Sequence, residues 1–377
     1  MSATIKLTTK IEQMTLEQGR RILVTSDIHG HLSYFKKVLE KACFCNDDIL
    51  FIVGDVIEKG PENLETLHYV MKLCERGNII PLIGNVDAYR LKLIYELSEE
   101  NVNGFYNYIL NLRQWAGTSF YEELANQCGY SINNPEDILL SKQSVIARFE
   151  NEFNFLANLP TIVETQKYIF VHGGLREKQV SDNIDKSVFD LTKYDAFAEN
   201  TPNIFDKYVV AGHWPVVLYG ADMPQMNPLI NHEKKIISID GGCGVKKDGQ
   251  LNLLIIPDIN CSIDRISHIS YDEIPTAYAL ENQSPSTESI YISWLNKEIR
   301  ILNKGKEFSY IEHIKSGQKL QIPNSYIRNE TECFDYTNYF LPVKKGDKLS
   351  IISKNSKGYI VKKDGVIGWY CGDLAIQ

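Results

Sequence analysis

Short apolar runs alternate with amphipathic stretches between residues 21 and 256. The runs are rich in Ile, Val and Leu and end at Gly, Asp, Asn or other polar residues, which is typical of strands buried in a sheet. They cover residues 21–25, 49–53, 79–83, 168–171, 208–211, 236–239 and 253–256. Between such runs, Leu32–Ala42 and Leu64–Leu73 carry apolar residues at helical spacing. Strands that alternate with helices predict an α/β (α+β) layered domain.

The stretch of residues 91–160 has a different pattern. Its apolar residues recur at helical spacing and it contains no strand-like run. The helical patterns lie at Leu91–Leu97, Gly104–Trp115, Phe120–Cys128 and Ser144–Leu159. We therefore expect a helical insertion over one edge of the sheet, within a first domain that covers residues 1–262.

The remainder of the chain is predicted to form a linker and two small β units. Residues 263–287 are polar and end in a Ser- and Pro-containing segment, which indicates a linker. Residues 302–311 resemble residues 343–352, so a weak repeat is present. We expect SH3-like β-barrels at 288–328 and 329–377.

Three aromatic residues of these β units have two interpretations. Tyr326, Trp369 and Tyr370 can line a groove that binds a peptide, as SH3 domains do, or can fill the small barrel cores. A peptide ligand for the tail is therefore one expectation, and simple packing is the alternative.

Metal-competent side chains follow the ends of the predicted strands. They are Asp27, His29, Asp55, Asn85, His172 and His213. Ligand sites of open α/β sheets form beyond the carboxyl ends of the strands, so we expect these residues to converge. A mixed oxygen and nitrogen set favours Mn, with Fe or Zn as alternatives, over Ca or Mg. Six ligands exceed what one catalytic metal takes, so two divalent metals that share Asp55 as a bridge are predicted.

Five short motifs stand in the order that a known family has. They are SDIHG at 26–30, GDVIEKG at 54–60, GNVD at 84–87, VHGGL at 171–175 and AGHWP at 211–215. In this order the chain resembles the phosphoprotein phosphatases, which are calcineurin-type metallophosphoesterases, and residues 155–161 resemble the bacterial serine/threonine branch. The resemblance spans roughly residues 21–256 and implies a β-sandwich flanked by helices.

The resemblance also implies the arrangement and chemistry of the site. Asp27 and His29 would bind one metal, and Asp55 would bridge to a second metal held by Asn85, His172 and His213. A hydroxide bound by both metals would attack phosphorus in line, and no phosphoenzyme would form.

The chain departs from the family at its proton donor and at its phosphate-binding arginine. The histidine of the family motif GNHE, which protonates the leaving oxygen, is Val86 here, and the acidic partner of that histidine is Glu58. Loss of a general acid typically costs about 10² to 10⁴ in rate, less for leaving groups such as phenols. Asp87, Glu58 and His31 are alternative acids.

Two basic residues are candidates for binding the phosphate group of the substrate. The phosphate-binding arginine of the family is Lys59 here, which can neutralise phosphate but lacks the bidentate fork. Lys59 is therefore predicted to act in catalysis and to bind the substrate. Arg176, directly after the VHGGL motif, is a second candidate phosphate contact, with a surface salt bridge as the alternative.

Composition limits the classes of binding partner and the cellular compartment that we expect for this protein. The net charge is −8 and no long basic run occurs, so a nucleic acid is not the expected main partner. No stretch has the length of a membrane span or the pattern of a signal peptide, so we expect a cytoplasmic protein without a membrane partner. The eight cysteines form no paired CxxC sets and are interpreted as reduced thiols.

These observations predict a metal-dependent phosphatase. Its expected substrates are phosphomonoesters, either a phosphoprotein or a small aryl phosphate. Two alternatives stay open: a pseudophosphatase that binds phosphorylated or peptide partners, and a phosphodiesterase for dinucleotides or cyclic nucleotides.

Overall fold

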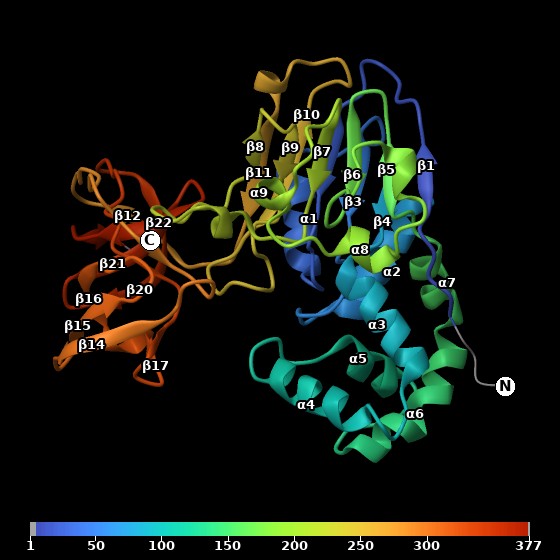
Figure 1. The fold of residues 1–377 in the computed structure, drawn as a ribbon, viewed down its shortest axis with the longest axis horizontal. Helices are drawn as coiled ribbons and strands as arrows, with labels where there is room; N and C mark the ends of the chain where they lie inside the picture. Colours follow the sequence, from blue (N-terminus) through green and yellow to red (C-terminus); the bar gives the residue numbers. More distant parts are fainter. Residues whose placement is uncertain (1–4, 376–377) are drawn as a thin grey trace. The chain divides into compact units, whose positions relative to one another are not determined.

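The computed structural model describes residues 5–375 (Figure 1). The chain divides into two compact units. Unit 1 contains Met1–Pro215 and Pro228–Asp272, and unit 2 contains Val216–Asn227 and Glu273–Gln377. Among the described residues, no helix combines the length and apolar character that crossing a bilayer requires.

The first sheet of unit 1 has five strands in the order β11-β10-β2-β3-β4. The central strands β2 (Ile22–Thr25), β3 (Ile49–Val53) and β4 (Ile79–Leu82) run parallel. The strands β10 (Leu251–Ile256) and β11 (Ser267–Tyr271) complete it in antiparallel fashion. The carboxyl ends of β2, β3 and β4 therefore lie along one edge of this sheet.

The second sheet of unit 1 has six strands in the order β1-β5-β6-β7-β9-β8. They are β1 (Ile11–Gln13), β5 (Ile162–Glu164), β6 (Tyr168–Val171), β7 (Tyr208–Ala211), β8 (Leu229–Asn231) and β9 (Ile236–Ser238). Strands β6, β7 and β9 are parallel. Buried residues of both sheets form one core, in which the rings of Phe51 and Phe170 stack with centroids 3.9 Å apart. The two sheets thus form a sandwich, which confirms the predicted fold class.

Helices α1 (Leu32–Lys41) and α2 (Asn63–Cys74) pack against the outer face of the first sheet (Figure 1). Five further helices form a lobe beyond the sheet, in which α4 and α5 both pack on α6 (Figure 1). They are α3 (Asn85–Glu96), α4 (Val102–Arg113), α5 (Phe120–Gln127), α6 (Pro135–Arg148) and α7 (Glu150–Asn158). Buried side chains such as Phe35, Leu67 and Phe153 join Leu50 of β3 in a second core. Helices α3 to α7 occupy the stretch for which a helical insertion is predicted.

Short helical segments complete the two units. In unit 1 they are α8 (Val188–Thr192), α9 (Phe197–Asn200), η1 (Val180–Asn183) and η3 (Ile263–Arg265), and in unit 2 they are η2 (Val216–Tyr219) and η4 (Asn324–Tyr326). The segment between α8 and α9 carries Asp195, whose side chain contacts His213, one of the predicted metal ligands.

Unit 2 is built from small antiparallel sheets. The largest has the order β22-β21-β20-β12-β23, with β12 (Thr276–Ala279), β20 (Lys348–Asn355), β21 (Gly358–Lys363), β22 (Val366–Tyr370) and β23 (Leu374–Ala375). A second has β14 (Ile299–Lys304), β15 (Phe308–His313) and β16 (Lys319–Pro323). Two strand pairs remain, β13 (Tyr291–Ile292) with β19 (Tyr336–Thr337) and β17 (Ile327–Arg328) with β18 (Glu332–Cys333).

The strands of unit 2 can be compared with the predicted linker and with the two predicted β units. The stretch 263–287, predicted as a linker, contains β11 of unit 1 and β12 of unit 2. The pairing of β13 with β19 connects the segments 288–328 and 329–377. Trp369 and Tyr370 are buried, which favours the packing alternative for these two rings. An SH3-like identity and a peptide ligand stay predictions.

One segment of unit 2 comes from the middle of the chain. Residues 216–227 follow β7 in the sequence but bond to the tail. Met226 N donates to Gly365 O over 2.8 Å, and Ile367 N donates to Pro224 O over 2.9 Å. The Asn227 side chain donates to Asp364 O over 2.7 Å. The tail sheet therefore includes a piece of chain that begins three residues after His213.

Candidate metal centre

The structure brings the six predicted metal ligands to one end of the sandwich. Each follows the carboxyl end of a strand: Asp27 and His29 follow β2, Asp55 follows β3, Asn85 follows β4, His172 follows β6 and His213 follows β7. In each sheet these strands are parallel, so their ends lie on one side. The contacts described next join all six residues into two clusters that share Asp55.

The first cluster consists of Asp27, His29 and Asp55. One potential ligand atom from each lies within 4.8 Å of the others. His29 Nε2 is 3.8 Å from Asp27 Oδ1 and 3.6 Å from Asp55 Oδ2. All three side chains are buried, so a cation would offset the cost of keeping two carboxylates out of water.

The second cluster consists of Asp55, Asn85, His172 and His213. His172 Nε2 is 3.3 Å from Asp55 Oδ1 and 3.0 Å from Asn85 Oδ1. The rings of His172 and His213 are 5.6 Å apart between centroids. His213 N also donates to Asp27 Oδ2 over 3.0 Å, which ties the two clusters together.

Backbone carbonyls orient two of the histidine rings. His29 Nδ1 donates to Ile57 O over 3.3 Å, and His172 Nδ1 donates to Val53 O over 2.7 Å. Because a carbonyl only accepts, Nδ1 carries the proton in both rings and Nε2 faces the carboxylates. This is the arrangement of metal-binding histidines, whose other ring nitrogen donates to a carbonyl or carboxylate.

The electrostatics of the clusters favour added positive charge. Burial raises the pKa of Asp27 to about 6, although the charge of His172 opposes this shift. Burial alone would lower the pKa of His172, but the carboxylates of Asp55 and Asp27 raise it to about 10. Burial would also raise the pKa of Asp55, yet the charge and hydrogen bond of His172 hold that pKa well below its usual range. Buried oxygen and nitrogen donors with this balance fit divalent cations.

Backbone strain is concentrated at the ligands. Asp27, His29, Asp55 and His213 have φ values of 53°, 48°, 54° and 64°, in the left-handed region that residues other than glycine rarely adopt. Such strained residues cluster at functional sites, where the surrounding structure holds them in place. Gly212 also allows a close approach, because a Cβ there would overlap Asp27 Oδ2.

The two predicted phosphate contacts lie in different environments. Lys59 Nζ is 3.2 Å from His29 Nε2, so this ammonium group points at the first cluster. The Arg176 guanidinium instead donates to Asp190 O over 2.8 Å and to Lys193 O over 2.9 Å. It also lies 4.0 Å from the centroid of the Tyr194 ring. The Arg176 guanidinium thus supports the loop that follows α8, and the partners described for it are not among the six ligands.

The carboxylate of Glu58 is occupied by an arginine of α3. Arg90 Nε donates to Glu58 Oε2 over 3.0 Å, and both residues are buried. The Arg90 guanidinium also lies 4.4 Å from the centroid of the Tyr108 ring. Burial raises the pKa of Glu58, and the charge of Arg90 opposes that shift. Glu58 therefore faces the helical insertion.

The other two alternative acids also have partners. Asp87 Oδ1 accepts from Val56 N over 3.0 Å and Ile57 N over 3.2 Å, and Asp87 Oδ2 accepts from Gly84 N over 3.0 Å. Burial and the charge of Asp55 raise the pKa of Asp87 to about 7. His31 Nδ1 donates to His29 O over 2.8 Å. Asp87 joins the loops after β3 and β4, so it supports the backbone of both.

Two acidic residues of this region were not among those predicted from the sequence. Asp195 Oδ1 lies 2.8 Å from His213 Nε2, and Asp195 lies in a loop without a motif. Asp240 follows β9, is buried and accepts from Gly242 N over 2.7 Å. Burial and the charge of Asp27 raise the pKa of Asp240 well above its usual range. Asp240 could have been found from the sequence, because it directly follows the apolar run 236–239, just as the predicted ligands follow other apolar runs.

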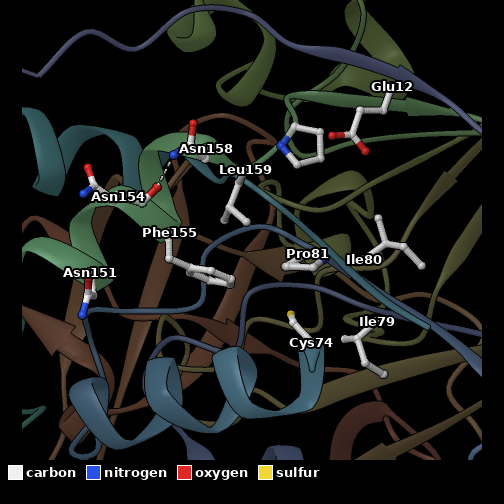
Figure 2. A pocket seen from close by; sticks show the side chains of 11 residues that line it. Glu12, Cys74, Ile79, Ile80, Pro81, Asn151, Asn154, Phe155, Asn158 and Leu159 are labelled. Carbon is white, nitrogen blue, oxygen red and sulfur yellow. Dashed lines mark hydrogen bonds between the residues drawn. The ribbon is translucent and has the colours of Figure 1, made fainter. Parts of the chain in front are cut away.

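A separate cavity of about 450 Å³ lies where β4 begins (Figure 2). Ile79 and Pro81 of β4 line it together with Asn154, Phe155 and Asn158 of α7. It contains none of the predicted ligands, which follow the other ends of the strands.

Comparison with known proteins shows the family to which the chain belongs. Residues 20–237 match the family model of the calcineurin-like phosphoesterases, and the chain belongs to that family. The prediction of a metal-dependent hydrolase of phosphate esters is thereby confirmed at the level of the family. The family uses divalent metals, for which the cluster of Asp27, His29 and Asp55 is a candidate site.

Individual relatives match over shorter stretches. Symmetrical bis(5'-nucleosyl)-tetraphosphatases are 33% identical over 94 residues in Buchnera aphidicola and 39% identical over 66 residues in Pseudomonas fluorescens. These matches cover 24% and 17% of this chain, and the chain spans only 33% and 23% of those proteins. A serine/threonine phosphatase structure from Saccharomyces cerevisiae is 11% identical, with a TM-score of 0.42 over 71% of this chain and 85% of that one.

Proposed function

We propose that the chain is a two-metal phosphohydrolase in which Asp55 bridges the metals. The observation that carries the proposal is that Asp55 Oδ2 faces His29 at 3.6 Å while Asp55 Oδ1 faces His172 at 3.3 Å. One carboxylate therefore presents one oxygen to each cluster. Two cations bound there, with Mn²⁺ as the expected metal, would neutralise phosphoryl charge and activate water.

Lys59 is the residue that we propose to bind the phosphoryl group. Its ammonium group reaches the first cluster, 3.2 Å from His29 Nε2. A lysine attracts a phosphate as a point charge, without the two parallel hydrogen bonds that an arginine makes. Its contribution should therefore be to charge neutralisation more than to orientation.

The preferred substrates should have leaving groups that depart without a proton. Val86 carries no titratable group, and the nearest acids of the motifs are engaged: Asp87 by backbone N–H groups and Glu58 by Arg90. Without a positioned acid, a poor leaving group such as an alkoxide would leave slowly. Aryl phosphates, phosphotyrosine and phosphoanhydrides meet this requirement.

A dinucleoside polyphosphate is the second candidate substrate. The relatives from Buchnera aphidicola and Pseudomonas fluorescens are named as symmetrical tetraphosphatases of this substrate class. Cleavage of a phosphoanhydride releases a nucleotide, which needs no added proton to depart. Both the relatives and the valine at position 86 thus support this candidate.

The test compares substrates with purified full-length protein and Mn²⁺. They are p-nitrophenyl phosphate, its bis ester, diadenosine tetraphosphate and a phosphoserine peptide. We expect turnover of the activated substrates, and loss of at least about 10³-fold in kcat for Asp55→Asn, since charge stabilisation of the transition state is the largest catalytic contribution.

Asp206→Asn, at an exposed aspartate outside the clusters, is the control. Two bound metals without turnover would contradict the proposal and favour a pseudophosphatase that binds phosphorylated partners.

A further inference from the structure

Asp195 contacts the ring of His213 from outside the two clusters. Its Oδ1 lies 2.8 Å from His213 Nε2, and the two residues are separated by 18 positions in the sequence. The side chain of His213 is 10% exposed and that of Asp195 is 53% exposed, so the carboxylate covers the ring from the solvent side. This contact differs from those of His29 and His172, whose rings are held by buried carbonyls.

The contact selects which nitrogen of His213 is available. A carboxylate accepts hydrogen bonds, so Nε2 of His213 carries the proton and donates it to Asp195. The lone pair then lies on Nδ1, whereas in His29 and His172 Nδ1 donates to a carbonyl and Nε2 is the nitrogen that faces the clusters. His213 N is held by Asp27 Oδ2 at the same time, so both the backbone and the ring tip are fixed.

The loop that carries Asp195 is itself anchored. Arg176 binds the carbonyls of Asp190 and Lys193 and lies against Tyr194, the residue before Asp195. The Asn200 side chain donates to Asp195 O over 3.0 Å. Thus a half-exposed carboxylate is delivered to the ring by a fixed backbone, which reduces the entropy lost in making the contact.

We propose that Asp195 is a positioning residue, which fixes the tautomer and orientation of His213 so that Nδ1 serves as its metal-binding nitrogen. Asp195 contacts neither substrate nor metal in this role. A carboxylate that supports a metal-binding histidine typically contributes about 10- to 100-fold to metal affinity. The inference rests on the two-metal site proposed above and adds to it a residue outside every motif.

The experiment measures Mn²⁺ binding to the full chain by isothermal titration calorimetry and by electron paramagnetic resonance. The wild type should bind two Mn²⁺ ions with an exchange-coupled signal. Asp195→Ala should weaken one of the two sites by about 10- to 100-fold and replace the coupled signal with that of isolated Mn²⁺. Asp195→Asn should lose less, because its amide oxygen can still accept the Nε2 proton.

The experiment includes a control variant and a check that each variant is folded. Asp206→Asn is the matched control, since Asp206 pairs with Lys178 on the surface and should leave both sites unchanged. Circular dichroism establishes that each variant is folded. Unchanged affinities and an unchanged coupled signal in Asp195→Ala would overturn the role of Asp195 while leaving the two-metal proposal intact. A wild type that binds no pair of metals would overturn the two-metal proposal itself, and the role of Asp195 with it.

Discussion

The backbone N–H of Val86 donates a hydrogen bond to Oδ1 of Asp55 over 2.8 Å. The residue that replaces the family's histidine therefore holds the proposed bridging carboxylate through its main chain. Because the side chain takes no part in this bond, position 86 can change without loss of the support for Asp55. The missing proton donor and the metal site can thus be examined separately.

Val86→His should restore part of the general-acid function. We expect kcat/KM for a phosphoserine peptide to rise by about 10-fold, below the usual 10² to 10⁴, because Glu58 is bound to Arg90 and cannot orient the new ring. The rate with p-nitrophenyl phosphate should change little. Val86→Leu, which adds volume without a ring nitrogen, is the control. An equal change for both substrates would contradict the assignment of position 86 to proton donation.

Gly212→Ala should weaken metal binding. A Cβ at this position would overlap Asp27 Oδ2 and approach Ser26, so Asp27 must leave its place in the first cluster. We expect the affinity for Mn²⁺ to fall by about 10- to 100-fold, as when the support of a ligand is lost. Titration calorimetry measures the change.

The matched control for Gly212 is Gly104→Ala. Gly104 lies inside α4, and a Cβ there meets no atom within 4 Å. It should leave Mn²⁺ affinity unchanged and stabilise the fold by about 0.5–1 kcal/mol, since alanine loses less backbone entropy in a helix. Equal Mn²⁺ affinities in both variants would show that the position of Asp27 is not critical.

The convergence of the six predicted ligands could be predicted from the sequence because their positions follow from strand ends. A buried run fixes where a strand stops, and the parallel order brings the following residues together, as for Asp55 after β3 and His172 after β6. The direction of Glu58 could not be predicted in this way. Glu58 and Lys59 both adopt positive φ, of 72° and 67°, and this local backbone decides which side chain faces the clusters.

Asp195 and the segment 216–227 were missed for a related reason. Neither has periodicity or a motif, and each acquires its role from a long-range hydrogen bond. Asp195 reaches His213 across 18 positions, and Met226 bonds to Gly365 in the tail. Such contacts depend on how loops are anchored in three dimensions, which apolar patterns do not encode.

Asp48 should make the fold sensitive to acid. Arg21 donates two hydrogen bonds to its carboxylate, over 2.8 and 2.6 Å, and Cys45 N donates a third over 2.9 Å. Burial alone would raise the pKa of Asp48, but these bonds lower it below the ordinary value of 3.8. A lowered folded-state pKa means that the stabilisation is present above pH 3.8 and is lost as the pH falls through the folded pKa.

Asp48→Asn should therefore destabilise the protein at pH 7 by about 1–3 kcal/mol, the scale of hydrogen bonds to charged groups. Its thermal midpoint should approach that of the wild type as the pH falls below 3.8. The neighbouring exposed Asp47→Asn is the control and should have no such effect. A difference between Asp48→Asn and wild type that stays constant from pH 7 to strongly acid conditions would contradict the assigned ion pair.

Gly365→Ala should release the segment 216–227 from the tail sheet. Gly365 has φ of 77°, and a Cβ there would overlap the side chain of Asn227, next to the bond from Met226 N to Gly365 O. We expect the amides of Met226 and Ile367 to exchange with solvent about 10- to 100-fold faster, which corresponds to a local loss of about 1–3 kcal/mol. Hydrogen exchange followed by mass spectrometry resolves these peptides.

Gly346→Ala separates the overlap from the strain of the backbone. Gly346 has φ of 91°, so alanine is strained there as well, but its Cβ would meet no atom within 4 Å. The exchange of Met226 and Ile367 should stay at the wild-type rate in this variant. If both variants accelerate exchange equally, general weakening of unit 2 explains the effect. If only Gly365→Ala does so, the segment that begins three residues after His213 is held by Gly365 and its neighbours.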